Sequence, residues 1–238
     1  VERYYCEIWV YGMKEMYNPV KEYALPDSLR EKVQFTGYIP RPLPKAKHVK
    51  NYRRKRGLSK DDKHIVVTTG GGGDGYKVLD TFLSMLEKHS SFPYKVSIIS
   101  GPFLSLDHYD QLFKRARAQN AAFTDFSRKM ERRLASADLV VSMGGYNTVC
   151  EILSLKRVSL IIPREDPREE QLIRARVLKE HGLADYIRWN ELTPDSMFAK
   201  IMDILENPGE LPANIEAFPM TGLKAMRARM AKFRKDFS

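Results

Sequence analysis

Four consecutive glycines, residues 70–73, are followed by Asp74 and Gly75, between an apolar run and a helix-like run. Glycine loses much conformational freedom on folding, so such a cluster indicates either a very tight turn or the close approach of a ligand. Backbone N–H groups of a glycine turn at the start of a helix can bind an anion such as phosphate. The spacing also fits a dinucleotide-binding loop, but that site needs an acid after the next strand, and residues 98–102 contain none. A P-loop is excluded because no Gly-Lys-Ser/Thr ending is present.

A second glycine pair, Gly144 and Gly145, also follows an apolar run and precedes a helix-like run. Asn147 and Thr148 would begin that helix, where backbone N–H groups favour a diphosphate. Glu151 follows about a turn and a half into the helix, among apolar neighbours. A carboxylate at this position can accept hydrogen bonds from two ribose hydroxyls. A glutamate that is simply exposed to solvent is the alternative.

A third polar loop, residues 163–171, again follows an apolar run and opens a helix. Such a loop could contact sugar hydroxyls, and Arg164 could stabilise a departing diphosphate. A solvated arginine and an ordinary charged helix start are the alternatives. Two glycine turns and a polar loop suggest one ligand that spans them, and a nucleoside diphosphate bearing a sugar has the right mixture of groups.

The elements that would position these loops alternate between strand and helix. Strands are expected at residues 64–69, 94–100, 121–126, 138–143, 158–163 and 184–189. Helices are expected at residues 76–88, 106–118, 127–136, 146–155, 168–181 and 194–206, the last with Thr193 as its N-cap. Continuous apolar strands are typical of a parallel sheet covered on both faces. The fold class is therefore predicted to be α/β, a Rossmann-like doubly wound parallel sheet, with ligands at the carboxyl ends of its strands.

The two ends of the chain have a different character. Strands are expected at residues 5–11 and 34–39, with an irregular stretch containing Pro19 and Pro26 between them. We interpret residues 1–45 as the end of another domain with a connector, 46–215 as the nucleotide-binding domain, and 216–238 as a basic amphipathic helix. The apolar positions of that helix recur at steps of three and four: Leu223, Met226, Met230, Phe233 and Phe237. Packing against the rest of the protein and lying on a membrane surface both remain open for it.

Charge is concentrated in two places. The chain has 238 residues and a formal charge of +10. Residues 45–60 hold eight Lys/Arg and no acid, and residues 224–236 hold six basic residues and one acid. The remaining residues carry no net positive charge, so a DNA-binding scaffold is not indicated. The run at 45–60 is expected to be a solvated linker and helix, with contact to anionic lipid or RNA as the alternatives.

Cysteine and histidine usage indicates no disulfide and no metal. Cys6 and Cys150 both lie in apolar stretches and are expected to be buried, reduced thiols of a cytoplasmic protein. No Cys/His spacing resembles a metal site, and the five histidines are expected to be surface or structural residues. No apolar run approaches the ~20 residues of a membrane-spanning helix.

Together, the motifs of residues 65–187 resemble the donor-binding, C-terminal half of GT-B glycosyltransferases. The most similar group contains the UDP-N-acetylglucosamine transferases of peptidoglycan synthesis, in family 28. The resemblance rests on the glycine loop, on the Gly-x-x-Thr-x-x-Glu pattern that ends at Glu151, and on Pro163 followed by a polar loop with Gln171. The segment also resembles predicted glycosyltransferases with the motif Gly-Gly-Tyr-Asn-Thr.

This resemblance implies a role for each loop. It implies that the glycine loop faces the acceptor and the diphosphate, through Gly71, Gly72, Gly73 and Asp74. It implies diphosphate binding at the second turn, ribose binding by Glu151, and a base near Phe126 and Ser127. The implied diphosphate residues of the second turn are Gly145, Asn147 and Thr148, and Gly144 is counted with the donor-binding residues. The implied donor-sugar contact is Gln171, with Asp166 or Glu170 nearby, and Arg164 is counted with the donor-binding residues for its expected effect on the departing diphosphate.

The implied activity is hexosyl transfer from a nucleotide sugar, UDP-linked, to an acceptor that the sequence does not identify. A lipid-linked acceptor and peripheral contact at the inner membrane face are expected. No metal or other cofactor is expected, because oriented amides and helix dipoles would stabilise the leaving diphosphate. A catalytic base would belong to the acceptor domain, most of which this sequence lacks, so no transfer is expected from the chain alone.

Two departures leave parts of this interpretation open. The glycine loop lacks the serine of the peptidoglycan enzymes, which leaves the phosphate contacts open. Glu170-Gln171 stands where two glutamines are usual, which leaves the sugar open. The alternatives are a sugar-nucleotide epimerase of related fold and a non-catalytic nucleotide- or nucleic-acid-binding module built around the basic run.

Overall fold

The computed structural model describes residues 3–71 and 73–236, which fall into two compact units. The first unit contains the chain up to Arg41 together with the chain from Ala217 onward, and the second is Pro42–Glu216. The second unit contains all three loops that the sequence analysis singled out.

The second unit is built on a six-stranded sheet in which every paired strand is parallel. The spatial order is β5-β4-β3-β6-β7-β8, so the chain moves outward from β3 on one side and from β6 on the other. The pair β3/β6 is therefore the point at which the strand order reverses, and the predicted doubly wound α/β fold is confirmed. The strands are β3 (His64–Thr68), β4 (Lys95–Ile99), β5 (Ala122–Thr124), β6 (Leu139–Ser142), β7 (Val158–Ile161) and β8 (Asp185–Tyr186).

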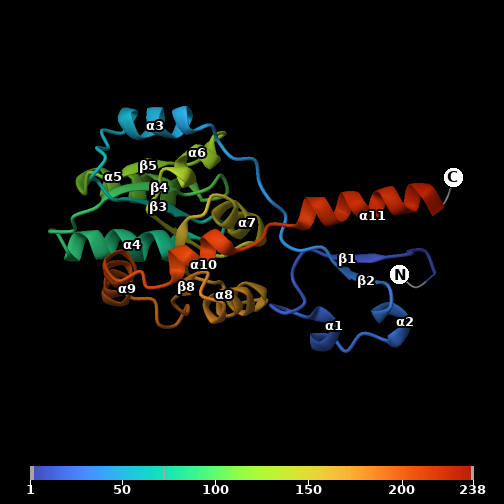
Figure 1. Cartoon of the computed structure of the whole chain (residues 1–238). Helices are drawn as coiled ribbons and strands as arrows, with labels where there is room; N and C mark the ends of the chain where they lie inside the picture. Colours follow the sequence, from blue (N-terminus) through green and yellow to red (C-terminus); the bar gives the residue numbers. More distant parts are fainter. Residues whose placement is uncertain (1–2, 72, 237–238) are drawn as a thin grey trace. The chain divides into compact units, whose positions relative to one another are not determined.

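Helices cover both faces of this sheet (Figure 1). The helices α4 and α9 contact each other on one face, and α3 and α6 contact each other on the other face. The bounds predicted for α4, α5 and α9 agree with the structure, whereas α6 begins three residues later than expected. The helices are α3 (Ala46–Lys55), α4 (Tyr76–Lys88), α5 (Leu106–Ala118), α6 (Met130–Ala135), α7 (Tyr146–Ser154), α8 (Glu170–Glu180), α9 (Pro194–Glu206) and α10 (Leu211–Ala217).

The central strand β3 supplies both faces of the core. Ile65 and Val67 pack in the cluster that includes α4, α5 and α9, while Val66 packs in the cluster that includes α6 and α7. All three side chains are fully buried. Burying an aliphatic side chain of this size stabilises the fold by about 1.5–3 kcal/mol relative to exposure. Burial on both faces explains why the strands are continuous apolar runs. It also fixes the position at which the loops that follow them leave the sheet.

The first unit contains two short parallel strands, β1 (Ile8–Val10) and β2 (Val33–Phe35). The stretch expected to be irregular holds two single-turn helices, α1 (Pro19–Glu22) and α2 (Asp27–Arg30). The predicted C-terminal helix is α11 (Gly222–Asp236), separate from α10, and Phe237 lies outside the described residues. Arg229 of α11 forms an ion pair with Glu7 at 2.6 Å, and it also donates a hydrogen bond to Gln34.

The two cysteines differ in environment. Cys150 is buried in α7, as predicted, and both thiols are free. Cys6 is exposed, so the prediction that it is buried was wrong. The reason is that β1 is short and begins only at Ile8, which leaves Cys6 ahead of the strand. No helix within residues 3–71 and 73–236 is long and apolar enough to cross a membrane.

Candidate functional site

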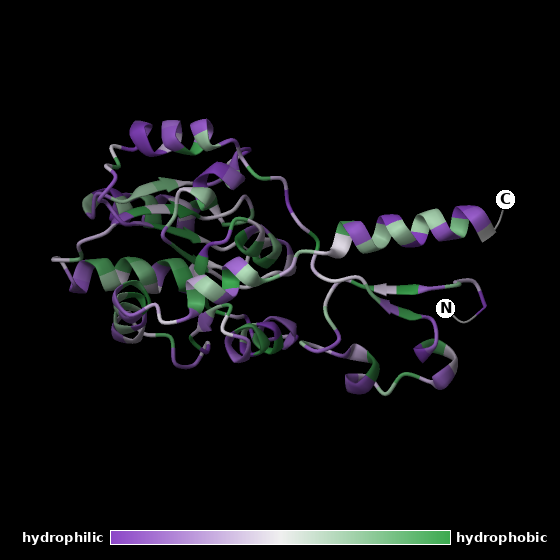
Figure 2. Ribbon diagram, viewed as in Figure 1, coloured by the Kyte–Doolittle hydropathy of each residue, from purple (hydrophilic) through white to green (hydrophobic). Residues whose placement is uncertain are grey.

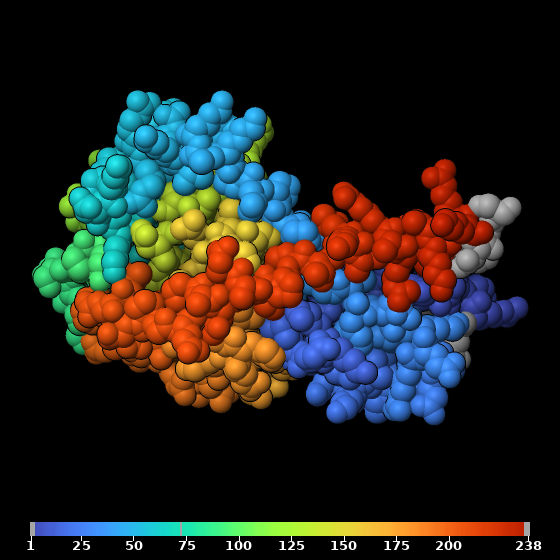
Figure 3. Space-filling view, in the orientation of Figure 1, coloured from blue at the N-terminus to red at the C-terminus, as the bar shows by residue number. Residues whose placement is uncertain are grey.

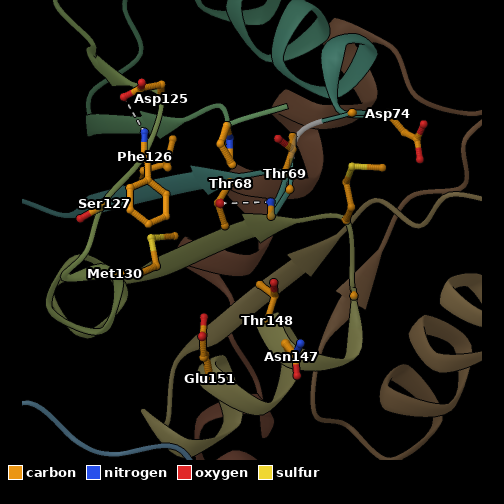
Figure 4. Close-up of a pocket in the computed structure, with 18 of the residues that line it drawn as sticks. Thr68, Thr69, Asp74, Asp125, Phe126, Ser127, Met130, Asn147, Thr148 and Glu151 are labelled. Carbon is orange, nitrogen blue, oxygen red and sulfur yellow. Dashed lines mark hydrogen bonds between the residues drawn. The ribbon is translucent and has the colours of Figure 1, made fainter. Parts of the chain in front are cut away.

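A cleft of about 640 Å³ lies at the carboxyl ends of β3 and β6, where the strand order reverses (Figure 4). Thr68 pairs in register with both Ser142 and Ile99, so the loops after β3, β6 and β4 leave the sheet at one level. The predicted site residues that line this cleft are Gly71, Gly73, Asp74, Phe126, Ser127, Gly145, Asn147, Thr148, Glu151 and Gln171.

The glycine loop between β3 and α4 is packed on one side and open on the other. A Cβ atom on Gly75 would overlap the side chain of Thr69, and one on Gly101 would overlap the backbone of Gly70 and Gly71. Gly73, in contrast, has no atom within 4 Å of an added Cβ. Both explanations for the glycines therefore apply, because part of the loop turns tightly and part leaves its backbone accessible. Gly72 was also a predicted site residue, and it lies outside the described residues.

Hydrogen bonds hold this loop against the segment after β4. Thr69 Oγ1 donates to the carbonyl of Ser100 at 2.6 Å, and the Phe103 N–H donates to the carbonyl of Gly71 at 2.9 Å. The Gly70 N–H donates to Thr68 Oγ1 at 3.3 Å (Figure 4). These bonds fix where the loop enters and leaves the cleft.

The two glycines of the second turn, Gly144 and Gly145, have different roles. Gly144 is buried with φ of +77°, and an added Cβ would lie 2.6 Å from Ile161 Cγ2. Its carbonyl accepts a hydrogen bond from Arg174 at 2.9 Å. Gly144 does not line the cleft, so its role is to form the turn and not to contact a ligand. Gly145 is the N-cap of α7, has no side-chain capping bond, and leaves open space around its Cα.

The two glycine turns face each other across the cleft. A Cβ on Gly70 would lie 3.7 Å from Thr148 Oγ1, which is ordinary van der Waals distance. The N-terminal end of α7 therefore lies beside the glycine loop. The first turn of a helix directs its backbone N–H groups away from the helix end and favours negative charge there. One small anion can contact both turns.

The cleft has an apolar end and a polar end. Phe126, with 56% of its surface exposed, lies close to Met130 at one end, and its N–H donates to Asp125 at 2.6 Å (Figure 4). Glu151 and Thr148 lie along α7 on the opposite wall. Ile99 and Met143 also line the cleft, so a flat aromatic group can meet apolar surface while polar groups meet the helix.

The third loop is connected to the first by an ion pair. Arg164 Nη1 lies 2.6 Å from Asp74 Oδ2, and Arg164 Nη2 lies 3.9 Å from Glu170. The Arg164 N–H donates to Gln171 Oε1 at 3.1 Å. Of these residues, Asp74 and Gln171 line the cleft, whereas Arg164 and Glu170 lie beside it. Asp166 was also a predicted site residue; it is exposed and does not line the cleft.

Glu165 anchors the third loop. Its carboxylate accepts a hydrogen bond from the Arg188 guanidinium at 2.7 Å and one from the Trp189 N–H at 3.0 Å. The bond from Arg188 lowers the pKa of Glu165, so the carboxylate stays ionised in the neutral range. The loop that carries Gln171 is thus tied to the segment after β8.

Several cleft residues were not predicted from the sequence. They are Thr68, Thr69, Gly70, Ile99, Gly101, Pro102, Asp125, Met130, Met143 and Tyr146. Gly101 and Pro102 follow a predicted strand directly, so the rule that ligands bind at the carboxyl ends of strands could have found them. Within the described residues, no group of three or more His, Cys, Asp or Glu side chains could hold a metal ion. The prediction that the site uses no metal stays a prediction.

Comparison with protein families gives one match that covers most of this chain. The family described as glycosyltransferase family 28 C-terminal domain matches residues 64–232. That range contains all three loops of the cleft, the six strands of the sheet and much of α11.

Curated relatives match over much of the chain. The UDP-N-acetylglucosamine--N-acetylmuramyl-(pentapeptide) pyrophosphoryl-undecaprenol N-acetylglucosamine transferase of Halalkalibacterium halodurans is 27% identical over 216 residues, 87% of this chain and 57% of that protein. The protein of the same name from Bacillus subtilis is 25% identical over 205 residues, 84% of this chain and 55% of that protein. The chain spans about half the length of the curated relatives it matches.

Solved structures share the fold. The calicheamicin glycosyltransferase CalG4 is 15% identical with a TM-score of 0.62, covering 98% of this chain and 52% of that one. MurG from Acinetobacter baumannii is 16% identical with a TM-score of 0.53, covering 86% of this chain and 54% of that one. These likenesses confirm the predicted fold, the C-terminal half of a GT-B glycosyltransferase.

Proposed function

Because this chain belongs to the glycosyltransferase family 28 C-terminal domain family, we propose that its cleft binds a UDP-linked sugar as the donor for glycosyl transfer. One observation carries the proposal: the glycine loop and the first turn of α7 lie side by side at the point where the strand order reverses, since a Cβ on Gly70 would lie 3.7 Å from Thr148 Oγ1. In open parallel sheets, ligands bind in the crevice at this point.

The diphosphate would lie between the glycine loop and the N-terminal end of α7. Gly73 and Gly145 leave open space around their Cα atoms, so phosphate oxygens can approach the backbone closely. Thr148 adds a hydroxyl beside Gly70. Helix N-termini and successive backbone N–H groups both favour an anion.

The rest of the nucleotide would extend from this position toward the apolar end. Glu151 would accept hydrogen bonds from the ribose hydroxyls, because a carboxylate accepts in two directions. The base would lie against Phe126, with Ser127 beside it. The sugar would extend the other way, toward Gln171, whose amide oxygen is already held by the backbone of Arg164.

Catalysis at this site would consist of stabilising the leaving group. When the bond from the anomeric carbon to the diphosphate breaks, negative charge grows on the diphosphate oxygen. Oriented backbone amides in the cleft would stabilise that charge in place of a metal, and one lost donor in such a site costs about 3 kcal/mol of transition-state stabilisation. Arg164 would act only indirectly, since its guanidinium is ion-paired with Asp74.

The acceptor is proposed from the names of the relatives. Those names specify a pyrophosphoryl-undecaprenol acceptor, which is lipid-linked, so we propose a lipid-linked acceptor and peripheral contact at the inner membrane face for the whole protein. No residue of the described cleft is placed as the base that activates the acceptor. We therefore expect this 238-residue chain to bind donor without transferring its sugar. The relatives are transferases, and the epimerase and the non-catalytic module gain no support from them.

Thermal-shift titration with UDP-, GDP-, ADP- and dTDP-sugars tests the proposal. A ligand at 100 times its dissociation constant stabilises the folded state by about 2.7 kcal/mol, so the true donor should raise the midpoint clearly. Glu151→Ala removes the proposed ribose contact and should weaken donor binding about 10- to 100-fold, because a hydrogen bond to a charged group contributes about 1.5–3 kcal/mol. No shift with any nucleotide sugar, or an equal shift in Glu151→Ala, would contradict the proposal.

A further inference from the structure

The helix α3 is an unusual element for a globular domain. Five of its ten residues are Lys or Arg, it contains no acid, and none of its residues is buried. Surface helices normally bury an apolar stripe, but here Val49 is the residue that packs against the core cluster beneath. The α3 ribbon is largely hydrophilic, and the helix lies on the outside of the second unit (Figures 2 and 3). Packing alone does not account for this helix.

A groove of about 1190 Å³ runs between α3 and the ends of α6 and α7. Its apolar part is formed by Leu43, Pro44, Ala46, Val49, Leu58, Ala135 and Leu155. Its basic part is formed by Lys47, Lys50, Arg53, Arg54, Lys60, Lys156 and Arg157. No acidic side chain lines it. An apolar groove edged only by cations is complementary to an anionic amphiphile.

Some of these cations hold the structure and others remain available. Arg53 donates to the carbonyls of Ser136 at 2.8 Å and Asp62 at 2.7 Å, which fixes the end of α3 to the domain. Lys47, Lys50 and Lys60 are exposed, and the described part of the chain offers them no ion-pair partner. Arg53 also pairs with Asp138 at 3.6 Å, whereas the charges of Lys47 and Lys50 are directed to solvent.

The opposite side of α3 is basic as well. A cavity of about 380 Å³ there is lined by His48, Asn51, Tyr52, Lys55, Phe126, Ser127, Arg128, Lys129, Arg132 and Arg133, again with no acid. Burial, and then the nearby charge of Arg132, lower the pKa of His48. Phe126 and Ser127 also line the candidate donor cleft, so this cavity adjoins the proposed base end.

We propose that the α3 surface, meaning the residues that line the groove of about 1190 Å³, binds the anionic phospholipid headgroups of a membrane. Clusters of Lys and Arg on a surface helix are attracted to anionic bilayers, and each such residue near the bilayer strengthens binding about fivefold. The headgroups contact Lys47, Lys50 and Arg54, and the apolar groove receives the upper part of an acyl chain. The inference goes beyond the proposed donor site and does not depend on it.

The α3 surface fits a membrane better than RNA. Single-stranded RNA is bound by aromatic side chains on which bases stack. Tyr52 of α3 is only partly exposed, and its ring is covered by Arg56 at 5.6 Å and Arg133 at 6.0 Å. The groove offers aliphatic surface instead, with Leu43 65% exposed at its edge. Aliphatic surface beside unpaired lysines suits an acyl chain below a phosphate headgroup.

Vesicle flotation with the 238-residue chain tests this proposal. We expect binding to vesicles of phosphatidylcholine with phosphatidylglycerol, weakening as salt rises, and none to phosphatidylcholine alone. The triple variant Lys47→Glu, Lys50→Glu, Arg54→Glu should bind at least ~100-fold more weakly. Leu43→Ser should reduce the binding that remains at high salt, because the apolar contact is not screened. The milder pair Lys47→Gln, Lys50→Gln covers the case in which charge reversal disturbs folding.

The second basic helix supplies a matched control. Lys224→Glu, Arg227→Glu, Lys232→Glu makes the same change in net charge at exposed positions of α11 and should leave vesicle binding within a few-fold of the parent. Equal loss in both triple variants, absence of binding to anionic vesicles, or binding to poly(U) RNA in preference to vesicles would each overturn the proposal. UDP binding, measured on the same variants, should be unchanged. If vesicle binding fails while UDP binding persists, only the inference about α3 fails, and the donor site stands.

Discussion

Two buried polar residues at opposite ends of the parallel sheet differ in their hydrogen bonding. At the amino end of β3, the His64 ring is buried, with Nε2 2.9 Å from Ser97 Oγ and Nδ1 3.1 Å from Ser136 Oγ. The backbone N–H of His64 donates a hydrogen bond to the carboxylate of Asp138. At the carboxyl end of β6, the buried hydroxyl of Ser142 has no hydrogen-bond partner among the described residues. The buried polar atoms of His64 are thus paired, whereas the hydroxyl of Ser142, one residue ahead of the cleft-lining Met143, is not.

The helix starts at the carboxyl end of the sheet also differ from one another. Thr193 caps α9 through a capping box, and Ser105 caps α5 with its side chain. The helices that open onto the cleft, α4 and α7, begin at Gly75 and Gly145 with no side-chain cap. Glycine at an N-cap is only a few tenths of a kcal/mol worse than a capping side chain, so both cleft helices start without a cap at little cost in stability. The difference indicates that the starts of α4 and α7 are arranged for a ligand, whereas the starts of α5 and α9 maintain the fold.

The largest effect should come from a residue that breaks this division, because Gly144 lies beside the cleft but serves the fold. Gly144→Val should lower the free energy of unfolding by about 3–5 kcal/mol, since a left-handed backbone and a crowded Ile161 contact each cost about 1–3 kcal/mol. Gly145→Ala is the matched control and should cost about 1 kcal/mol or less, because nothing lies within 4 Å of its new methyl group. Urea unfolding measures both, and equal stability of the two variants would refute the argument.

At the amino end, His64 should make stability depend on pH. Burial lowers the pKa of His64 from 6.5 to about 4, so the unfolded chain binds a proton between these values and the folded chain does not. The contribution of His64 to the free energy of unfolding is therefore fully present above pH 6.5. It is lost as the pH drops toward 4, by at most about 3 kcal/mol. Urea unfolding at pH 4 to 7 should show a shallower slope in His64→Gln than in the parent. Parallel slopes would mean that His64 is not the group that titrates.

At the carboxyl end, Phe126 should affect binding and leave stability unchanged. Phe126→Ala should weaken UDP binding about 5- to 100-fold, because stacking of a base on an aromatic side chain is worth about 1–3 kcal/mol. Its half-exposed ring adds little to the core. Tyr23→Ala, at a residue of the first unit that is 70% exposed and does not line the cleft, is the control and should bind UDP as the parent does. Calorimetric titration measures the UDP affinity of both variants. Equal affinities would contradict the proposal that the base lies against Phe126.

The elements flanking the cleft could be predicted well from the sequence, because their determinants are local. The apolar periodicity of α4, α5 and α9 marks their bounds, and the capping residue before α9 is visible as Thr193-Pro194. The single-turn helices α1 and α2 were missed because their prolines were interpreted as breakers. In α1 the proline is the first helical residue, where its missing N–H costs nothing.

The site could be predicted only in part, because its remaining members depend on strand order and register. The glycine turns and Glu151 follow single strands and were found from the sequence. Gly101 follows a predicted strand and could have been a candidate on that ground, but it enters this cleft only because β4 lies beside β3, which the strand order decides. Arg164 was expected near the diphosphate, but its ion pair with Asp74 joins residues 90 positions apart. Side-chain pairing across loops is decided by tertiary structure, beyond the reach of motif spacing.

That ion pair should give the smallest effect on stability and a revealing effect on binding. Asp74 is 58% exposed and Arg164 26% exposed at the side chain, so their coupling energy in a double-mutant cycle with Asp74→Asn and Arg164→Gln should stay below about 1 kcal/mol. Binding of UDP should move in opposite directions. Asp74→Asn releases a positive charge beside the diphosphate and should tighten binding a few-fold at low salt, whereas Arg164→Gln leaves the carboxylate uncompensated and should weaken it. If both variants weaken binding, Asp74 contacts the ligand directly, and the glycine loop contributes a carboxylate as well as backbone N–H groups.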